Sequence, residues 1–116
     1  MEFEFNYLKV IYGRGIPIFF KEGVRLDGAK VETLMGICIA AFVLHQNGHV
    51  CTVTSVMDGR HMENSLHYKG RAFDLRSRMI SKDKQPRMVM AFKDALGDSW
   101  DVVLEKDHFH LEFDPK

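Results

Sequence analysis

Two short segments in which polar and apolar residues alternate constrain the fold of this chain most strongly. They are "RAFDLR", residues 71–76, and "HFHLEF", residues 108–113. Successive side chains of a strand point to opposite faces, so each segment is predicted to be a strand with Phe and Leu in the core. The opposite face is then expected to carry these polar side chains: Asp74, His108, His110 and Glu112.

The length and composition of the chain predict one ordinary globular domain. Its 116 residues include 46% apolar and 28% charged residues, which suits a single compact domain over residues 1–116. Acidic and basic residues number 16 each, so no net charge drives the chain towards nucleic acid or an anionic membrane. We expect a monomer with neither of these partners.

No segment of the sequence predicts export or membrane insertion. The first ten residues, "MEFEFNYLKV", carry acids where a secretory signal has bases, and the longest apolar run, residues 34–44, is too short for a bilayer. We therefore expect synthesis in the cytoplasm without a signal peptide. Cys38 and Cys51 lie in apolar contexts and are expected to be reduced core thiols.

The first half of the chain contains the signals of a long helix. Residues 5–20 suggest a short strand, a Gly-Pro turn and a second apolar piece. Residues 27–46 are predicted to be a buried helix, with Asp27 as N-cap and Asn47-Gly48 as the stop. The residues expected to recur along it at helical spacing are Val31, Leu34, Cys38, Ala41, Phe42 and His45.

The second half adds strands and a shorter helix. Residues 49–56 are β-branched and predict a strand, residues 57–65 predict a polar loop, and residues 86–96 predict a helix that Gly97 ends. Residues 101–113 predict either two short strands or one bent strand. The expected class is α+β: a small, mostly antiparallel sheet with helices packed on one face.

Two histidines on one strand face suggest a metal site on this sheet. His108 and His110 would share a face and could meet His67 and Asp74 from another segment. Catalytic zinc takes three N or O ligands and keeps one position for water. A lone His-x-His pair on a strand is usually an ordinary surface feature, so the inference depends on both segments together.

The order of residue types in these segments resembles a known superfamily. "SLHYKGRAFDLR", residues 65–76, matches the motif S-x-H-x-x-G-x-A-x-D, and the later H-x-H completes it. This is similar to the LAS zinc peptidases, which include D-alanyl-D-alanine carboxypeptidases, phage L-alanyl-D-glutamate endolysins, murein endopeptidases and the hedgehog domain. The resemblance covers roughly residues 27–113 and implies a hedgehog-like fold with zinc bound on the sheet.

The resemblance also implies roles for individual residues. The implied zinc ligands are His67, Asp74 and His110. His108 would stabilise an oxyanion beside the metal. Weaker assignments concern three residues: His61 matches a histidine behind the metal ligands, Ser65 orders the loop, and Arg71 is either solvated or bound to a substrate carboxylate.

The general base has two candidates. Many members place an acid three residues before the last zinc ligand, which gives Asp107 if that ligand is His110 and Glu105 if it is His108. Members with an H-x-H pair set the acid further back, which favours Glu105. Either carboxylate could activate water for attack on a carbonyl.

The predicted function is that of a zinc metallopeptidase that hydrolyses peptidoglycan stem peptides, as a D-Ala-D-Ala carboxypeptidase or an L-Ala-D-Glu endopeptidase. The small size resembles phage or prophage endolysins, which degrade the cell wall after release; carriage in a phage particle is the other expectation. The alternatives are an inactive zinc-binding or virion structural module of the same fold, and a metal-free interaction domain.

Overall fold

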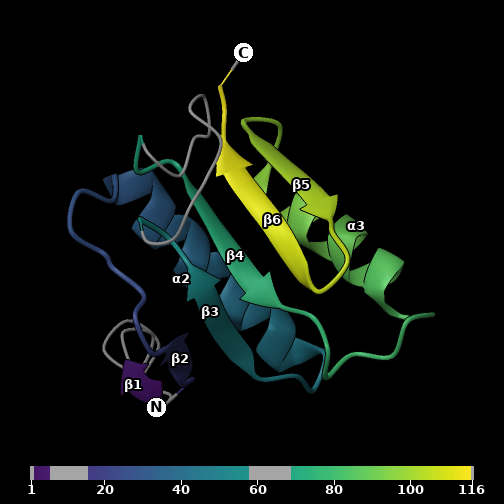
Figure 1. Ribbon diagram of the computed structural model, residues 1–116. Helices are drawn as coiled ribbons and strands as arrows, with labels where there is room; N and C mark the ends of the chain where they lie inside the picture. Colours follow the sequence, from purple (N-terminus) through teal and green to yellow (C-terminus); the bar gives the residue numbers. More distant parts are fainter. Residues whose placement is uncertain (1, 6–15, 58–68, 116) are drawn as a thin grey trace.

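The computed structural model describes residues 2–5, 16–57 and 69–115 and places eight elements in this order (Figure 1): β1 (Glu2–Phe5), β2 (Ile18–Lys21), α2 (Val31–Gln46), β3 (Cys51–Ser55), β4 (Ala72–Arg76), α3 (Gln85–Leu96), β5 (Trp100–Leu104) and β6 (His108–Phe113). Parts of the expected first strand and of the polar loop, residues 6–15 and 58–68, lie outside the described residues. The C-terminal stretch forms two strands, not one bent strand.

The strands form one mixed sheet in the order β1-β2-β3-β4-β6-β5. Only β2 and β3 pair in parallel among these strands, and α2 is the crossover that parallel neighbours require. Both helices lie behind the sheet in Figure 1, and α2 and α3 contact each other. This confirms the expected α+β class, with a mostly antiparallel sheet and helices on one face.

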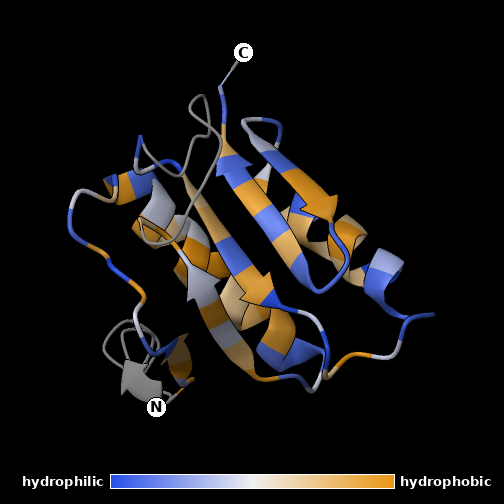
Figure 2. Ribbon diagram, in the orientation of Figure 1, coloured by the Kyte–Doolittle hydropathy of each residue, from blue (hydrophilic) through white to orange (hydrophobic). Residues whose placement is uncertain are grey.

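The alternation along β4 and β6 builds the core as predicted. Phe73 and Leu75 of β4 and Phe109 and Leu111 of β6 are all 0% exposed. Blue and orange bands alternate along β4 in Figure 2, as expected for a strand whose two faces differ in polarity. Ala72 and Asp74, on the face opposite Phe73 and Leu75, are buried as well, at 0% and 8% exposed. The faces of both strands were therefore predicted correctly. Cys51 is also buried and Cys38 half-buried, both as free thiols, as expected.

The start of α2 was predicted wrongly and its end correctly. The helix begins at Val31, because the Asp27 carboxylate binds the Arg25 guanidinium at 3.1 and 2.7 Å instead of capping a helix. At the other end Asn47 is the C-cap and Gly48 follows with a φ of 78°. A left-handed glycine after the last turn is a common helix stop.

The buried face of α2 also differs from the prediction. Val31 and Leu34 are exposed, at 65% and 41%, and His45 is exposed too. The buried side of the helix consists of Thr33, Gly36, Ile37, Ala40, Ala41, Val43 and Leu44. Apolar residues occur on every side of this helix, so their spacing does not predict which side is buried. Gly36 decides it, because a Cβ there would lie 2.5 Å from the Trp100 ring.

The chain just before β4 is fastened to the start of α2. The Gly70 carbonyl accepts a hydrogen bond from the Lys30 backbone N–H at 2.9 Å and another from the Thr33 hydroxyl at 2.6 Å. Gly70 has a φ of 73°, and a Cβ at this position would lie 2.3 Å from the Gly28 carbonyl oxygen. Gly70 is therefore required for this close approach of two backbones, which places β4 against the helix.

We predict that Gly70→Ala destabilises the protein more than Gly48→Ala does. Both glycines have a left-handed φ, 73° and 78°, but only Gly70 has backbone atoms where the new Cβ would lie. Gly48→Ala should cost about 1–2 kcal/mol of unfolding free energy, and Gly70→Ala roughly 1–3 kcal/mol more. Urea unfolding of both variants measures this difference, and equal losses would contradict it.

Candidate metal centre

The face of the sheet opposite the helices carries the polar residues of three neighbouring strands. Asp74 of β4 lies directly across from His110 of β6, and Asp101 of β5 lies directly across from Glu112 of β6. Residues paired in this way share one face of a sheet. The register therefore brings the two sequence motifs together at His110.

Asp74 and His110 are in direct contact. The His110 Nδ1 atom lies 2.9 Å from Asp74 Oδ1, and both side chains are largely buried, with 18% and 12% exposed. The register of β3 is irregular where Ser55 pairs with Asp74. Such irregularities often adjust the direction of a functional side chain.

A second carboxylate binds the other ring nitrogen of His110. Glu112 Oε1 lies 2.7 Å from His110 Nε2, so the imidazole stands between two acids. The hydrogen bond with Asp74 raises the pKa of His110 from 6.5 to about 9; burial opposes this effect, and the hydrogen bond with Glu112 adds to it. Without metal, His110 is therefore a cation at neutral pH that donates hydrogen bonds to Asp74 and Glu112.

His108 belongs to the same cluster. Its Nε2 atom lies 3.7 Å from Asp74 Oδ2, while its Nδ1 atom lies 2.6 Å from Asp107 Oδ1. Asp74 thus directs one oxygen towards each histidine. The hydrogen bond with His108 holds the pKa of Asp107 below its ordinary value, although the Asp107 side chain is 83% exposed.

Glu105, the other candidate base, lies across a tight turn from His108. The Glu105 N–H donates to the His108 carbonyl at 2.9 Å, which closes a hairpin whose loop is residues 106–107. Continuing the β5–β6 register places Glu105 on the same face as His108. The Glu105 side chain is exposed.

Four predicted site residues remain. His61, Ser65 and His67 lie outside the described residues. Arg71 is exposed just before β4, and its carbonyl accepts a hydrogen bond from the Phe113 N–H at 2.7 Å. The roles of these four residues stay predictions.

The residue types gathered around Asp74, two imidazoles and a carboxylate, are ones that zinc accepts as ligands. The two histidines lie 2.9 and 3.7 Å from different oxygens of Asp74, and the three side chains are not among the groups of described residues whose donor atoms all lie within 4.8 Å of one another. The described residues alone therefore do not complete a zinc site, and His67, the third implied ligand, lies outside them.

A second group of donors was missed by the sequence analysis. Asp101, Glu112 and Asp114 have oxygen atoms that all lie within 4.8 Å of one another, and this group could hold a metal ion. It contains only oxygen donors, which suit Mg²⁺ or Ca²⁺ better than zinc. The register alone reveals it, because Asp101 lies opposite Glu112 in the β5–β6 ladder.

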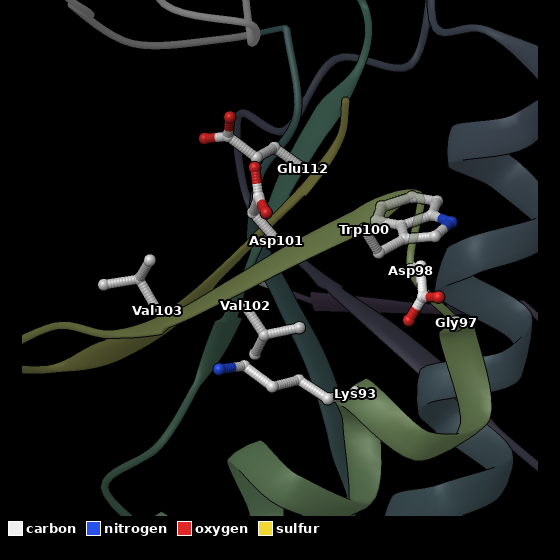
Figure 3. Close-up of a pocket in the computed structure, with 8 residues that line it drawn as sticks. All are labelled: Lys93, Gly97, Asp98, Trp100, Asp101, Val102, Val103 and Glu112. Atoms are coloured by element: carbon white, nitrogen blue, oxygen red, sulfur yellow. The ribbon is translucent and has the colours of Figure 1, made fainter. Parts of the chain in front are cut away.

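A pocket of about 540 Å³ adjoins this acidic group at the sheet edge formed by β5. Its lining comes from the end of α3 and the residues after it, from β5 and from β6: Lys93, Gly97, Asp98, Trp100, Asp101, Val102, Val103 and Glu112. Asp101 and Glu112 lie side by side in Figure 3. Glu112 is therefore shared by the pocket, the acidic group and the His110 cluster.

Comparison with known proteins finds no relative: no family model, no curated protein and no solved structure matches the chain. Among the described residues, neither helix has the length and apolar character needed to cross a membrane.

The pKa of His110 predicts how stability of the metal-free protein depends on pH. The pKa of His110 in the folded protein, about 9, exceeds the ordinary 6.5. The stabilisation that protonated His110 gives the folded state is therefore complete below pH 6.5 and is lost as the pH rises through 9. The difference in unfolding free energy between the parent and His110→Gln should therefore shrink by on the order of 2 kcal/mol between pH 6 and pH 10. Urea unfolding with a chelator present measures it. A difference that does not change with pH would contradict the assigned contacts.

Proposed function

We propose that this protein is a zinc metallopeptidase that hydrolyses peptide bonds in peptidoglycan stem peptides. The observation that carries the proposal is the contact between Asp74 and His110. These residues come from motifs 36 positions apart, and they meet at 2.9 Å on the face of the sheet opposite the helices. The sequence motif requires both as ligands of one zinc ion, together with His67.

In this proposal the chain supplies the ligands and orients the reacting groups. Zinc, when bound, polarises a carbonyl and makes water acidic near neutral pH. Asp74 and His110 would hold the metal from two neighbouring strands. The burial of Phe73, Leu75, Phe109 and Leu111 behind these strands supports fixed positions for these two side chains.

His108 and Asp107 act as an oriented pair. Asp107 accepts the Nδ1–H of His108 at 2.6 Å, which leaves Nε2 on the side of Asp74. A substrate carbonyl beside the metal would then meet His108 Nε2, which can donate a hydrogen bond to the developing oxyanion when both ring nitrogens carry a proton, because Asp107 already holds the Nδ1–H. Asp107 fixes the ring for this task.

Glu105 is the better candidate for the general base. The Asp107 carboxylate is engaged by His108, whereas Glu105 lies across the hairpin on the same face as that histidine. A carboxylate there can take a proton from the attacking water and return it to the leaving amine.

The substrate class rests on the resemblance of the two motifs to LAS peptidases. We propose that the protein, acting as a monomer, reaches the cell wall after release from the cytoplasm or within a phage particle. D-Ala-D-Ala and L-Ala-D-Glu bonds are the candidate targets. Zinc binding with no release of muropeptides would instead favour the inactive binding module.

We predict about one bound zinc per chain and release of peptides from purified peptidoglycan. Asp74→Ala, His110→Ala and His67→Ala should each lower zinc content sharply and abolish release, because three ligands are needed to hold the ion. His45→Ala, which changes an exposed histidine at the end of α2, is the matched control and should keep both. Metal analysis and mass spectrometry of released muropeptides are the measurements. Full zinc in His110→Ala with loss in His108→Ala would show that the other histidine is the ligand.

The two acids should respond differently to neutralisation. Glu105→Gln should keep zinc and lower kcat by ~10²-fold or more, as the loss of a general base does. Asp107→Asn should lower kcat by a smaller factor, because the amide oxygen still accepts the His108 Nδ1–H. Kinetics on the muropeptide substrate test both variants. A larger loss in Asp107→Asn than in Glu105→Gln would reverse the assignment.

A further inference from the structure

β5 is an edge strand of the sheet. It pairs with β6 on one side, and in the part of the chain that the structure describes no strand pairs with its other side. Its sequence, "WDVVL", contains no proline and no lysine, and its register with β6 is regular over five residue pairs. Proline, lysine and bulges are common devices that keep an edge strand from pairing with another chain. The edge of β5 lacks all three and can therefore accept a further strand.

Two backbone hydrogen bonds that flank β5 show which of its peptide groups point outwards. The Asp114 N–H donates to the Ser99 carbonyl at 2.8 Å just before β5 begins, and the Glu105 N–H donates across the hairpin at 2.9 Å just after it ends. Alternate residues of an antiparallel strand bond to the same neighbour, so the odd-numbered residues of β5 bond to β6. The N–H and C=O groups of Val102 and Leu104 therefore point to the free edge.

The pocket of about 540 Å³ runs along this free edge (Figure 3). Residues 100–103 all line it, although the side chains of successive strand residues point to opposite faces of a sheet. One pocket borders all four residues because it follows the edge of the strand, where the two faces meet. Open space therefore lies beside the outward N–H and C=O groups of Val102, where an added strand would bind.

The lining of the pocket favours a particular pattern of side chains in such a strand. Asp101 and Val103 share the face opposite the helices, and Val103 is 46% exposed. The carboxylates of Asp101, Glu112 and Asp114 lie within 4.8 Å of one another on that face, whereas Lys93 lines the pocket from α3 on the other face. A cation is therefore favoured opposite Asp101, an apolar side chain opposite Val103 and an acid on the side of Lys93.

We infer that the free edge of β5 binds an extended peptide, which joins the sheet as an antiparallel strand and places a lysine or arginine opposite Asp101. Recognition by strand addition takes its affinity from main-chain hydrogen bonds and its specificity from side chains that alternate between two faces. The antiparallel register gives the order apolar, acidic, basic from the N-terminal side of the peptide. A second copy of this chain is disfavoured, because pairing of β5 with β5 would gather the acids of both copies along one joint. The site does not depend on the proposed zinc ligands.

Fluorescence anisotropy with the labelled peptide Thr-Val-Glu-Arg-Thr tests the site. The parent should bind this peptide more tightly than the isomer Thr-Val-Arg-Glu-Thr, because the exchange moves each charge to the wrong face. Asp101→Asn should weaken binding by about 2–5-fold, as the loss of one cross-strand charge pair does. Asp94→Asn is the matched control and should leave binding unchanged, because it removes an exposed acid of α3 that does not line the pocket.

Two further measurements distinguish an added strand from attraction between charges alone. A peptide methylated on the Glu nitrogen keeps both charges but cannot donate to the Val102 carbonyl, and it should bind about 2–10-fold more weakly. In hydrogen exchange followed by NMR, the unmethylated peptide should slow exchange of the Val102 and Leu104 amides. The Val103 amide, which already bonds to β6, should change little.

The inference would be overturned by any of three results: no binding of the first peptide at millimolar concentration, equal affinity for the methylated peptide, or protection on a strand other than β5. Slow exchange of the Val102 amide that increases with the concentration of protein alone would show that a second copy occupies the edge instead. A chelator should change none of these results, so they are independent of the proposed zinc peptidase activity.

Discussion

The pairing of β4 with β6 is the interaction on which the rest of this structure depends. Five residue pairs define it, from Ala72 opposite Glu112 to Arg76 opposite His108. Each strand presents large apolar side chains to the helices and polar ones to the opposite face. A shift of the register by one residue would turn Phe73 and Leu75 away from the helices and Asp74 towards them, so the hydrophobic effect opposes it strongly. The same force that builds the core therefore sets Asp74 opposite His110.

Sequence periodicity predicted the parts of the fold that depend on neighbours along the chain. The strand faces around Phe73 and Phe109 follow from alternation, and the end of α2 follows from Gly48. The buried face of α2 did not follow, because its decisive contact joins Gly36 to Trp100, which is distant in sequence. The start of α2 was also predicted wrongly: Asp27 binds Arg25 instead of capping the helix, and Lys30 and Thr33 bind the carbonyl of Gly70, which is distant in sequence.

The candidate site, like the fold, could be predicted only where spacing along the chain determines it. The grouping of Asp74, His108 and His110 could be predicted, because residue spacing on strands and the order of residue types both pointed to it. The orientation of His108 by Asp107 and of His110 by Glu112 depends on side-chain geometry that spacing does not contain. Asp101 joins Glu112 only through the β5–β6 register, whereas Asp114 follows Glu112 by two positions along the chain.

The hairpin between β5 and β6 positions the acids Glu105 and Asp107 independently of the Asp74–His110 pair. Its loop consists of residues 106–107 alone, which is the shortest common connection between antiparallel strands. The Asp74–His110 pair takes its position from β4 and β6, whereas Asp107 takes its position from this turn and Glu105 borders it. Residues inserted into the turn would therefore move Asp107 while leaving the Asp74–His110 pair in place. Loops tolerate such insertions at small entropic cost. The arrangement lets the acids beside the hairpin change with loop length, with the β4–β6 ladder kept constant.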